Sequence, residues 1–246
     1  MRIETTQTVG EIAAANPWSI RVFETLGIDY CCGGKRSLTD ACSRVGMDPA
    51  QVVDLLADTE RAASVKNTTR WDDQPLRRLT AHIIEAHHGY VRREIPRLEA
   101  MGAKLTAKHG SRKPEVALIS ELFSAMAQEL KTHMMKEEQI LFPFIEEMEV
   151  AIERDRPLPT SCFLSVERPI ANMVADHDDA GAILTRIRDL SSGYIAPEDG
   201  CFTFRAFYQG LAEFERDLHE HIHLENNILF PRAVAMEAAA VPVKAS

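Results

Sequence analysis

The 246-residue sequence has no long apolar run, no cluster of basic residues and no regular cysteine framework. No uninterrupted apolar stretch approaches the roughly 18 residues that suggest a membrane-spanning helix, and residues 1–18 lack the basic start and apolar core of an export signal. Lys and Arg number 28 against 37 Asp and Glu, so the formal net charge is −9. These absences argue against a nucleic acid or a membrane as the partner.

Cysteine usage is also unlike that of a secreted, disulfide-bonded protein. There are five cysteines, an odd number, and the only regular feature among them is the adjacent pair Cys31 and Cys32. We therefore expect the reducing cytoplasm as the compartment. With 45% apolar and 26% charged residues, the chain is long enough for one large and one small globular domain.

One motif occurs twice in the second half of the sequence. Residues 133–143 read HMMKEEQILFP and residues 221–231 read HIHLENNILFP, so both copies fit the pattern H-x-x-x-E-x-x-I-L-F-P at an offset of 88 residues. On an α-helix, residues four apart project from the same face. Each copy therefore offers one imidazole and one carboxylate, His133 with Glu137 and His221 with Glu225, to a common point.

Two more histidines lie in apolar helical stripes. Following His88 in steps of three and four gives an apolar face, whereas the stripes through His87 and His82 are poorer, so His88 is predicted to face inward. His177 lies in a similar apolar stripe. His88 precedes His133 by 45 residues and His177 precedes His221 by 44, which indicates an internal duplication of a helical hairpin.

These patterns predict an all-α fold, with a four-helix, up-down-up-down bundle at residues 74–240 and a small helical domain at residues 1–65. The bundle helices are expected at about 74–101, 114–148, 166–190 and 202–239, with a linker at 61–73 and a polar connection at 149–165. Pro143 and Pro231 each remove a backbone donor and are expected to kink or end their helices just beyond the site.

The bundle core would hold a mixed set of nitrogen and oxygen ligands. Carboxylates are costly to bury unless they are paired or bind metal, and four imidazoles with two carboxylates suit iron or manganese. Two histidines per metal with both carboxylates bridging is the economical arrangement, and it leaves room for an oxo or hydroxo bridge and an open position. The predicted ligands are His88, His133, Glu137, His177, His221 and Glu225.

Each part of this pattern alone has a structural explanation. A single inward histidine is usually a hydrogen-bonded core residue, and one H-x-x-x-E spacing also fits an exposed helical pair. Repetition at matching offsets is what favours a metal site. The other five histidines are expected at the surface or around the ligands: His82, His87, His109, His219 and His223.

The small domain contains one unusual loop, Asp29 to Arg36, which reads DYCCGGKR. Thr8, Ser37 and Asp48 are expected to begin helices around it, and Gly27 to end one. Adjacent thiols beside two glycines have room to react, and Lys35 and Arg36 would favour thiolate. Alternatively, Cys31 and Cys32 pack as small apolar residues beside a glycine turn. The spacing alone does not decide between the two.

The paired H-x-x-x-E-x-x-I-L-F-P motifs, with His88 and His177, resemble a hemerythrin-type bundle, and DYCCGGKRSL resembles the small domain of the repair-of-iron-centres (RIC, ScdA-like) di-iron family. A closely similar branch in denitrifying bacteria binds NO. The resemblance implies a non-haem centre of two iron ions, with manganese less favoured, at the six ligands above. It also places the family's cysteine pair at Cys31 and Cys32, as redox or iron-transfer thiols.

The function that the resemblance implies is repair of iron-sulfur clusters under nitrosative and oxidative stress, by iron donation and by binding or reducing NO. Damaged iron-sulfur proteins would be the partners, and NO or O2 the small ligands. The alternative is a carrier or sensor of O2 or NO without repair activity, for which His87 could supply a fifth histidine. A homodimer is one oligomeric state that the sequence leaves open.

Overall fold

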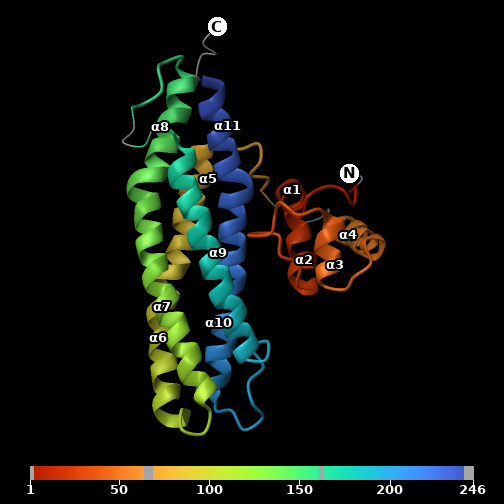
Figure 1. Ribbon diagram of the computed structural model, residues 1–246, viewed down its shortest axis with the longest axis vertical. Coiled ribbons are helices and arrows are strands. Elements are labelled where there is room, and N and C mark those ends of the chain that lie inside the picture. Colours follow the sequence, from red (N-terminus) through yellow and green to blue (C-terminus); the bar gives the residue numbers. More distant parts are fainter. Residues whose placement is uncertain (1–2, 64–68, 161–162, 164, 241–246) are drawn as a thin grey trace. The chain divides into compact units, whose positions relative to one another are not determined.

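The structure is a computed structural model that describes residues 3–63, 69–160, 163 and 165–240 (Figure 1). Within these ranges every regular element is a helix, and one isolated bridge joins Thr8 and Ser37. None of the helices in the described ranges is long and apolar enough to cross a membrane. The residues form two compact units. The first comprises Met1–Thr80, Ile145–Val166 and His219–Ser246, and the second comprises Ala81–Phe144 and Glu167–Leu218.

The N-terminal part of the first unit has short helices that begin and end at the expected residues. They are α1 (Val9–Ala15), η1 (Pro17–Ser19), α2 (Ile20–Leu26), α3 (Leu38–Arg44) and α4 (Pro49–Ala63). Thr8 and Glu11 form a reciprocal capping box at α1, and Gly27 ends α2 at φ 68°. Ser37 accepts a hydrogen bond from the Asp40 amide at the start of α3. These helices enclose their own apolar core, which includes Phe23, Leu38 and Leu56.

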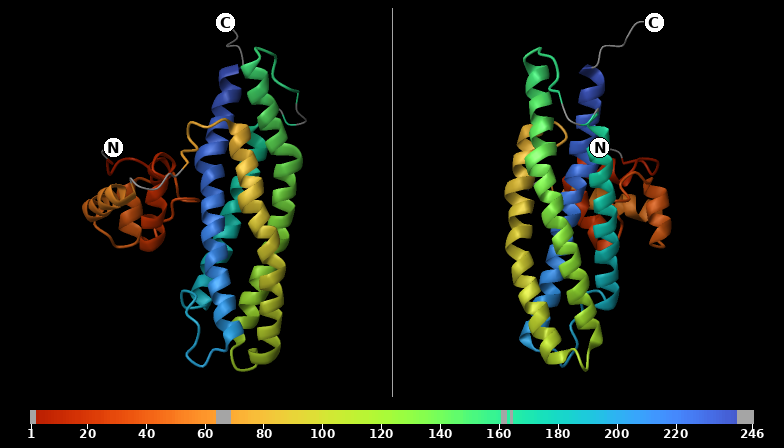
Figure 2. Two further views of the ribbon diagram at one scale, coloured as in Figure 1. Left: turned by 180° about the vertical axis from the view of Figure 1, so that it is seen from behind. Right: turned by 60° about the vertical axis from the view of Figure 1, so that its left-hand side comes forward.

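The second unit contains the four long helices of the predicted up-down-up-down bundle. They are α6 (Gly89–His109), α7 (Pro114–Lys136), α9 (Glu167–Leu190) and α10 (Phe202–Leu224), the last of which extends beyond Leu218. Helices α6 and α7 form an antiparallel hairpin (Figure 1), and α7 also packs along α9 (Figure 2). The predicted apolar stripes face inward. Phe123 and Phe214, for example, meet edge to face with ring centroids 5.2 Å apart.

Three of the long helices contain a π-helical turn, which the sequence analysis did not predict. The turns are η2 (Ile83–His88), between α5 (Leu76–His82) and α6; η3 (Glu137–Leu141), between α7 and α8 (Phe142–Glu153); and η4 (Glu225–Leu229), between α10 and α11 (Phe230–Ala240). In η3 the Phe142 amide donates to the Glu137 carbonyl, and in η4 the Phe230 amide donates to that of Glu225. These bonds span five residues instead of four.

The sequence predicts that Pro143 and Pro231 kink or end their helices, and the structure excludes the second outcome. Both prolines lie inside continuing helices, because each follows a widened turn that accommodates the missing amide donor. The predicted helix limits also fell short, since α6 reaches His109 and α8 reaches Glu153. The linker expected at 61–73 begins within α4. The proposed boundary at residue 65 lies outside the described residues.

Candidate metal centre

All six predicted ligands are buried, and none has a relative exposure above 3%. Four sit on α-helices or at the end of η2, and the two glutamates begin η3 and η4. A π turn contains more residues than an α-helical turn. The side chains of Glu137 and Glu225 therefore leave the helix in directions that a regular α-helix would not give them. The sequence placed the residues on the correct elements, and the π turns add the local geometry.

The structure gathers these side chains into two overlapping groups that could each hold a metal ion. One group is His88, Glu137, His221 and Glu225, and the other is His133, Glu137, His177 and Glu225. Within each group, one candidate ligand atom from every residue lies within 4.8 Å of the others. Both groups share Glu137 and Glu225, so the arrangement is consistent with a di-metal centre.

The contacts show which imidazole nitrogens face the centre. Nε2 of His88 lies 3.4 Å from Glu137 Oε2, and Nε2 of His133 lies 3.2 Å from Glu137 Oε1. The Nε2 atoms of His133 and His177 are 3.0 Å apart, and Nε2 of His221 is 3.0 Å from Glu225 Oε1. The same ring nitrogen of all four histidines is therefore directed toward the carboxylates or toward another ligand.

Two further carboxylates orient the histidines from the opposite side. Nδ1 of His88 lies 2.5 Å from Glu138 Oε1, and Nδ1 of His133 lies 3.1 Å from Asp176 Oδ2. A carboxylate on Nδ1 fixes the imidazole with its Nε2 lone pair facing inward, an arrangement common around protein-bound metals. Sequence reasoning missed both residues. The only signal was adjacency, since Glu138 follows Glu137 and Asp176 precedes His177.

The Glu138 carboxylate also has a cationic partner. Nη2 of Arg92 donates to Glu138 Oε1 at 2.6 Å. Burial alone would raise the pKa of the Glu138 carboxyl, but the hydrogen bonds from His88 and Arg92 outweigh it and leave the pKa lowered. Glu138 is therefore an ionised acceptor for His88.

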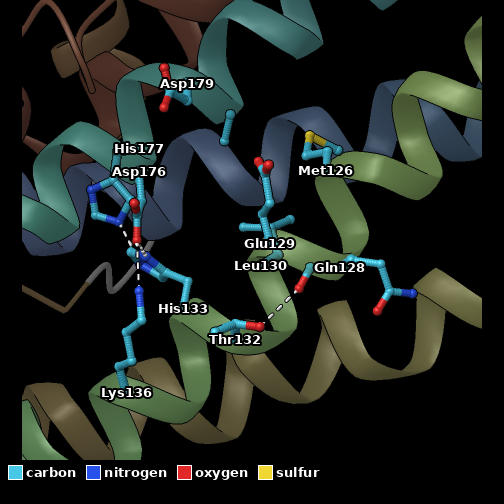
Figure 3. Close-up of a pocket in the computed structure, with 11 residues that line it drawn as sticks. Met126, Gln128, Glu129, Leu130, Thr132, His133, Lys136, Asp176, His177 and Asp179 are labelled. Carbon is cyan, nitrogen blue, oxygen red and sulfur yellow. Dashed lines mark hydrogen bonds and ion pairs between the residues drawn. The ribbon is translucent and has the colours of Figure 1, made fainter.

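A cavity of about 390 Å³ opens beside the second group of ligands, between α7 and α9. His133 and His177 contribute to its wall, and Lys136 Nζ lies 3.6 Å from Asp176 Oδ2 next to them (Figure 3). The remaining lining residues are mixed polar and apolar: Met126, Gln128, Glu129, Leu130, Thr132, Asp179 and Ala180. The histidine side of the centre thus borders a space that a small molecule could occupy.

Comparison with known proteins identifies the family. The hemerythrin HHE cation binding domain matches residues 79–233, and ScdA_N, a domain of unknown function, matches residues 5–60. The iron-sulfur cluster repair protein YtfE of Pectobacterium atrosepticum is 37% identical over 232 residues, which cover 94% of this chain and 98% of the relative. The protein of the same name from Yersinia pseudotuberculosis is 36% identical over 233 residues, with the same coverage. This chain belongs to the YtfE family. The predicted resemblance is confirmed.

Two histidines outside the two ligand groups are also buried. His87 is buried, and its Nδ1 lies 3.2 Å from Asp217 Oδ1; it belongs to neither metal-binding group of the described residues. His223 is also buried, and burial lowers its pKa to about 4. His223 contacts Asn227, whose Nδ2 lies 3.0 Å from its Nδ1, and the ring of Tyr30, whose centroid is 5.4 Å away, so the sequence analysis did not predict its surroundings.

Cys31 of this YtfE-family chain does not have the thiolate environment that Lys35 and Arg36 suggested. Cys31 is buried and donates to Asp29 Oδ1 at 3.5 Å. Its contact with Cys32, together with burial, raises the Cys31 pKa well above its usual value. Arg36 lies 3.7 Å from Asp29 Oδ2, so its charge is partly balanced there. Cys31 thus fits the packing interpretation, whereas Cys32 is half-buried.

Proposed function

We propose that this chain is a cytoplasmic di-iron protein of nitrosative and oxidative stress, which repairs iron-sulfur clusters by donating iron and binds NO at the same centre. The observation that carries the proposal is the pair of buried groups that share Glu137 and Glu225. The relatives named iron-sulfur cluster repair proteins support the repair activity, because the similarity extends over 94% of this chain.

The donor set fits two iron ions. Four imidazoles and two fully buried carboxylates favour iron or manganese over metals that prefer thiolate, and divalent cations would offset the cost of burying the carboxylates. In this assignment His88 and His221 would hold one ion and His133 and His177 the other, and Glu137 and Glu225 would be shared by both ions. Iron is the preferred assignment because the relatives' name specifies iron-sulfur clusters.

The protein's own residues would do two things. Glu138 and Asp176 hold His88 and His133 in the orientation that ligation needs. The cavity between α7 and α9 gives a diatomic ligand such as NO or O2 space beside His133 and His177. Bound iron with open coordination positions would supply the redox chemistry toward such ligands.

For iron donation, damaged iron-sulfur proteins are the proposed partners and an iron ion is the cargo. Cys31 and Cys32 are the proposed thiols that accept the iron or relay electrons. Of the two, Cys32 is the more exposed and is the better placed to meet a partner protein. A protein in which both are replaced by serine should keep its metal and lose transfer, and unchanged transfer would exclude the thiols from the mechanism.

The first experiment is metal analysis of protein purified without oxygen, followed by titration with NO and incubation with an apo form of a [2Fe-2S] protein in the presence of inorganic sulfide. Two iron ions per chain, one for each group, with nitrosyl absorption bands and a rebuilt cluster, would support the proposal. Glu137→Gln should lower iron retention because both groups lose a shared ligand. Two retained irons with unchanged spectra would contradict the ligand assignment.

The alternative is a carrier or sensor without repair activity. It predicts a reversible complex with O2 or NO and no iron transfer to the apo protein. The same sample distinguishes the two functions, since only repair consumes bound iron.

A further inference from the structure

Asn227 contacts the cysteine loop of the N-terminal domain, and both belong to the first compact unit. It lies in η4, two residues after Glu225. Its Nδ2 donates to the Tyr30 carbonyl at 3.1 Å and to the Cys31 carbonyl at 3.4 Å. One amide side chain therefore joins the turn that carries a predicted metal ligand to the backbone of Cys31.

Two glycines make room for this side chain. A Cβ atom at Gly34 would lie 2.3 Å from Asn227 Oδ1, and one at Gly10 would lie 2.5 Å from the same oxygen. Neither distance is compatible with a real contact, so any larger residue at these positions would displace Asn227 or the loop. The Gly10 amide donates to the Gly34 carbonyl at 2.8 Å, which holds the two glycines together next to Asn227.

Neighbouring side chains extend the same contact surface. Nδ1 of His219 lies 3.0 Å from Glu24 Oε1, and that oxygen also accepts a hydrogen bond from the Tyr30 hydroxyl at 2.9 Å. The Tyr30 ring meets the rings of both His219 and His223 at steep angles. Hydrogen bonds and aromatic packing thus surround the Asn227 side-chain amide.

We infer that Asn227 is a positioning residue that holds the Cys31–Cys32 loop against η4, through a fit that requires glycine at positions 10 and 34. The Asn227 contact, defined as Asn227 with Gly10 and Gly34, fixes where the thiols lie relative to the turn that begins with Glu225. A role of this contact in passing iron to the thiols rests on the proposed function. The contact itself does not depend on any metal chemistry.

The test is a double-mutant cycle in the full-length, metal-loaded protein with Gly34→Ala, Asn227→Ala and the two together. The readouts are the rate of Cys31 alkylation by a maleimide, followed by peptide mass spectrometry, and amide hydrogen exchange over residues 28–36. Each single variant should increase the alkylation rate roughly tenfold, because each breaks the same contact and loosens the loop that buries Cys31. Residues in contact are also energetically coupled. In the Asn227→Ala background, Gly34→Ala should add less than about twofold, since the clashing atoms are gone.

Gln209→Ala is the matched control, because it removes an exposed amide from α10 whose recorded partner is Glu213. Equal alkylation rates for Asn227→Ala and Gln209→Ala would overturn the inference, as would fully additive effects in the double variant. Asn227→Asp provides a second measurement if Gly34→Ala does not fold. It keeps the shape but loses the donor to Tyr30 and Cys31, so it should also increase alkylation, and a wild-type rate would overturn the inference.

These readouts separate the contact from the proposed function. The double-mutant cycle does not measure iron transfer. A protein that transfers no iron would therefore contradict the repair activity and leave the Asn227 contact unaffected. Conversely, a failed cycle would leave the metal centre and its proposed activity unchanged.

Discussion

Single residues around the histidines determine how the predicted metal ligands are oriented. Glu138 is the best example, because it accepts from His88 on one side and from Arg92 on the other. Such a carboxylate fixes the tautomer of the imidazole and increases its basicity as a ligand. The residue next to a ligand in the sequence thus contributes to metal binding without touching the metal.

Glu138→Gln should therefore weaken metal binding by about 10–100-fold, since a neutral amide is a weaker partner for His88 Nδ1. Competition with a chromophoric chelator, using Co²⁺ as a probe, measures the affinity. Glu147→Gln on the exposed face of α8 is the control. If both variants bind Co²⁺ equally well, Glu138 does not orient His88.

The burial of Cys31 leads to a prediction about pH. A thiol ordinarily ionises near pH 8.5, and the contact with Cys32 and burial raise the Cys31 pKa well above that value. At pH 7 to 8 Cys31 should therefore remain a thiol. The thiolate absorbance at 240 nm, compared between wild type and Cys31→Ser across pH, isolates its titration. A midpoint below pH 8 would contradict the burial of this side chain.

At this scale the sequence predicted the six residues that form the two buried groups but not their supporting residues. Periodicity and repetition identify inward histidines, because both depend only on positions within one helix. The partners of Glu138, Asp176 and Asn227 lie on other elements. Those contacts depend on how elements far apart in sequence pack, which no single-helix pattern contains.

Among the elements, the π turns are the feature that distinguishes this bundle from four regular helices. Two of them, η3 and η4, begin at Glu137 and Glu225, and a proline follows two residues after each of these two turns ends. Helix propensities and apolar stripes predicted the helices correctly. They could not predict the turns, because a π turn differs from an α turn by one residue, and the proline signal fits a kink equally well.

Pro143→Ala tests the link between the proline and the turn. Removing a proline from a helix interior should stabilise the metal-free protein by about 1–3 kcal/mol, because the α-helical bonding pattern regains a donor. The same change should weaken metal binding, since Glu137 loses the position that the π turn gives it. Urea unfolding and chelator competition measure the two effects. Pro157→Ala, outside any helix, is the control, and unchanged affinity would disprove the link.

For the whole molecule, the metal centre is expected to contribute directly to stability, because it joins carboxylates and imidazoles from both helical hairpins. A metal that binds only the folded state at about 100 times its dissociation constant adds about 2.7 kcal/mol, or roughly 5–10 °C in Tm for a chain of this size. Calorimetry of the iron-loaded protein before and after chelation measures this difference. Equal melting temperatures would argue against a metal at these ligands.

The duplication also explains why the fold could be predicted from sequence. Two hairpins with matching histidine offsets imply a four-helix arrangement before any contact is known, and the structure confirms the four long helices and the direction of their apolar faces. The contacts between the small domain and η4 were not predictable, because they depend on surface fit at Gly10 and Gly34 and not on any periodic pattern.

The π turns have a consequence for how this chain tolerates insertions and deletions. Each extra residue advances a helix by about 100°, so the apolar faces before and after η3 belong to different rotational phases. Deleting one residue within Glu137–Leu141 would restore a continuous α-helix and keep the core of α8 in phase, whereas the same deletion within regular α7 would turn every following side chain away from the core. We therefore expect a one-residue deletion in η3 to preserve the fold while changing the position of Glu137, whereas the same deletion within α7 should disrupt the core.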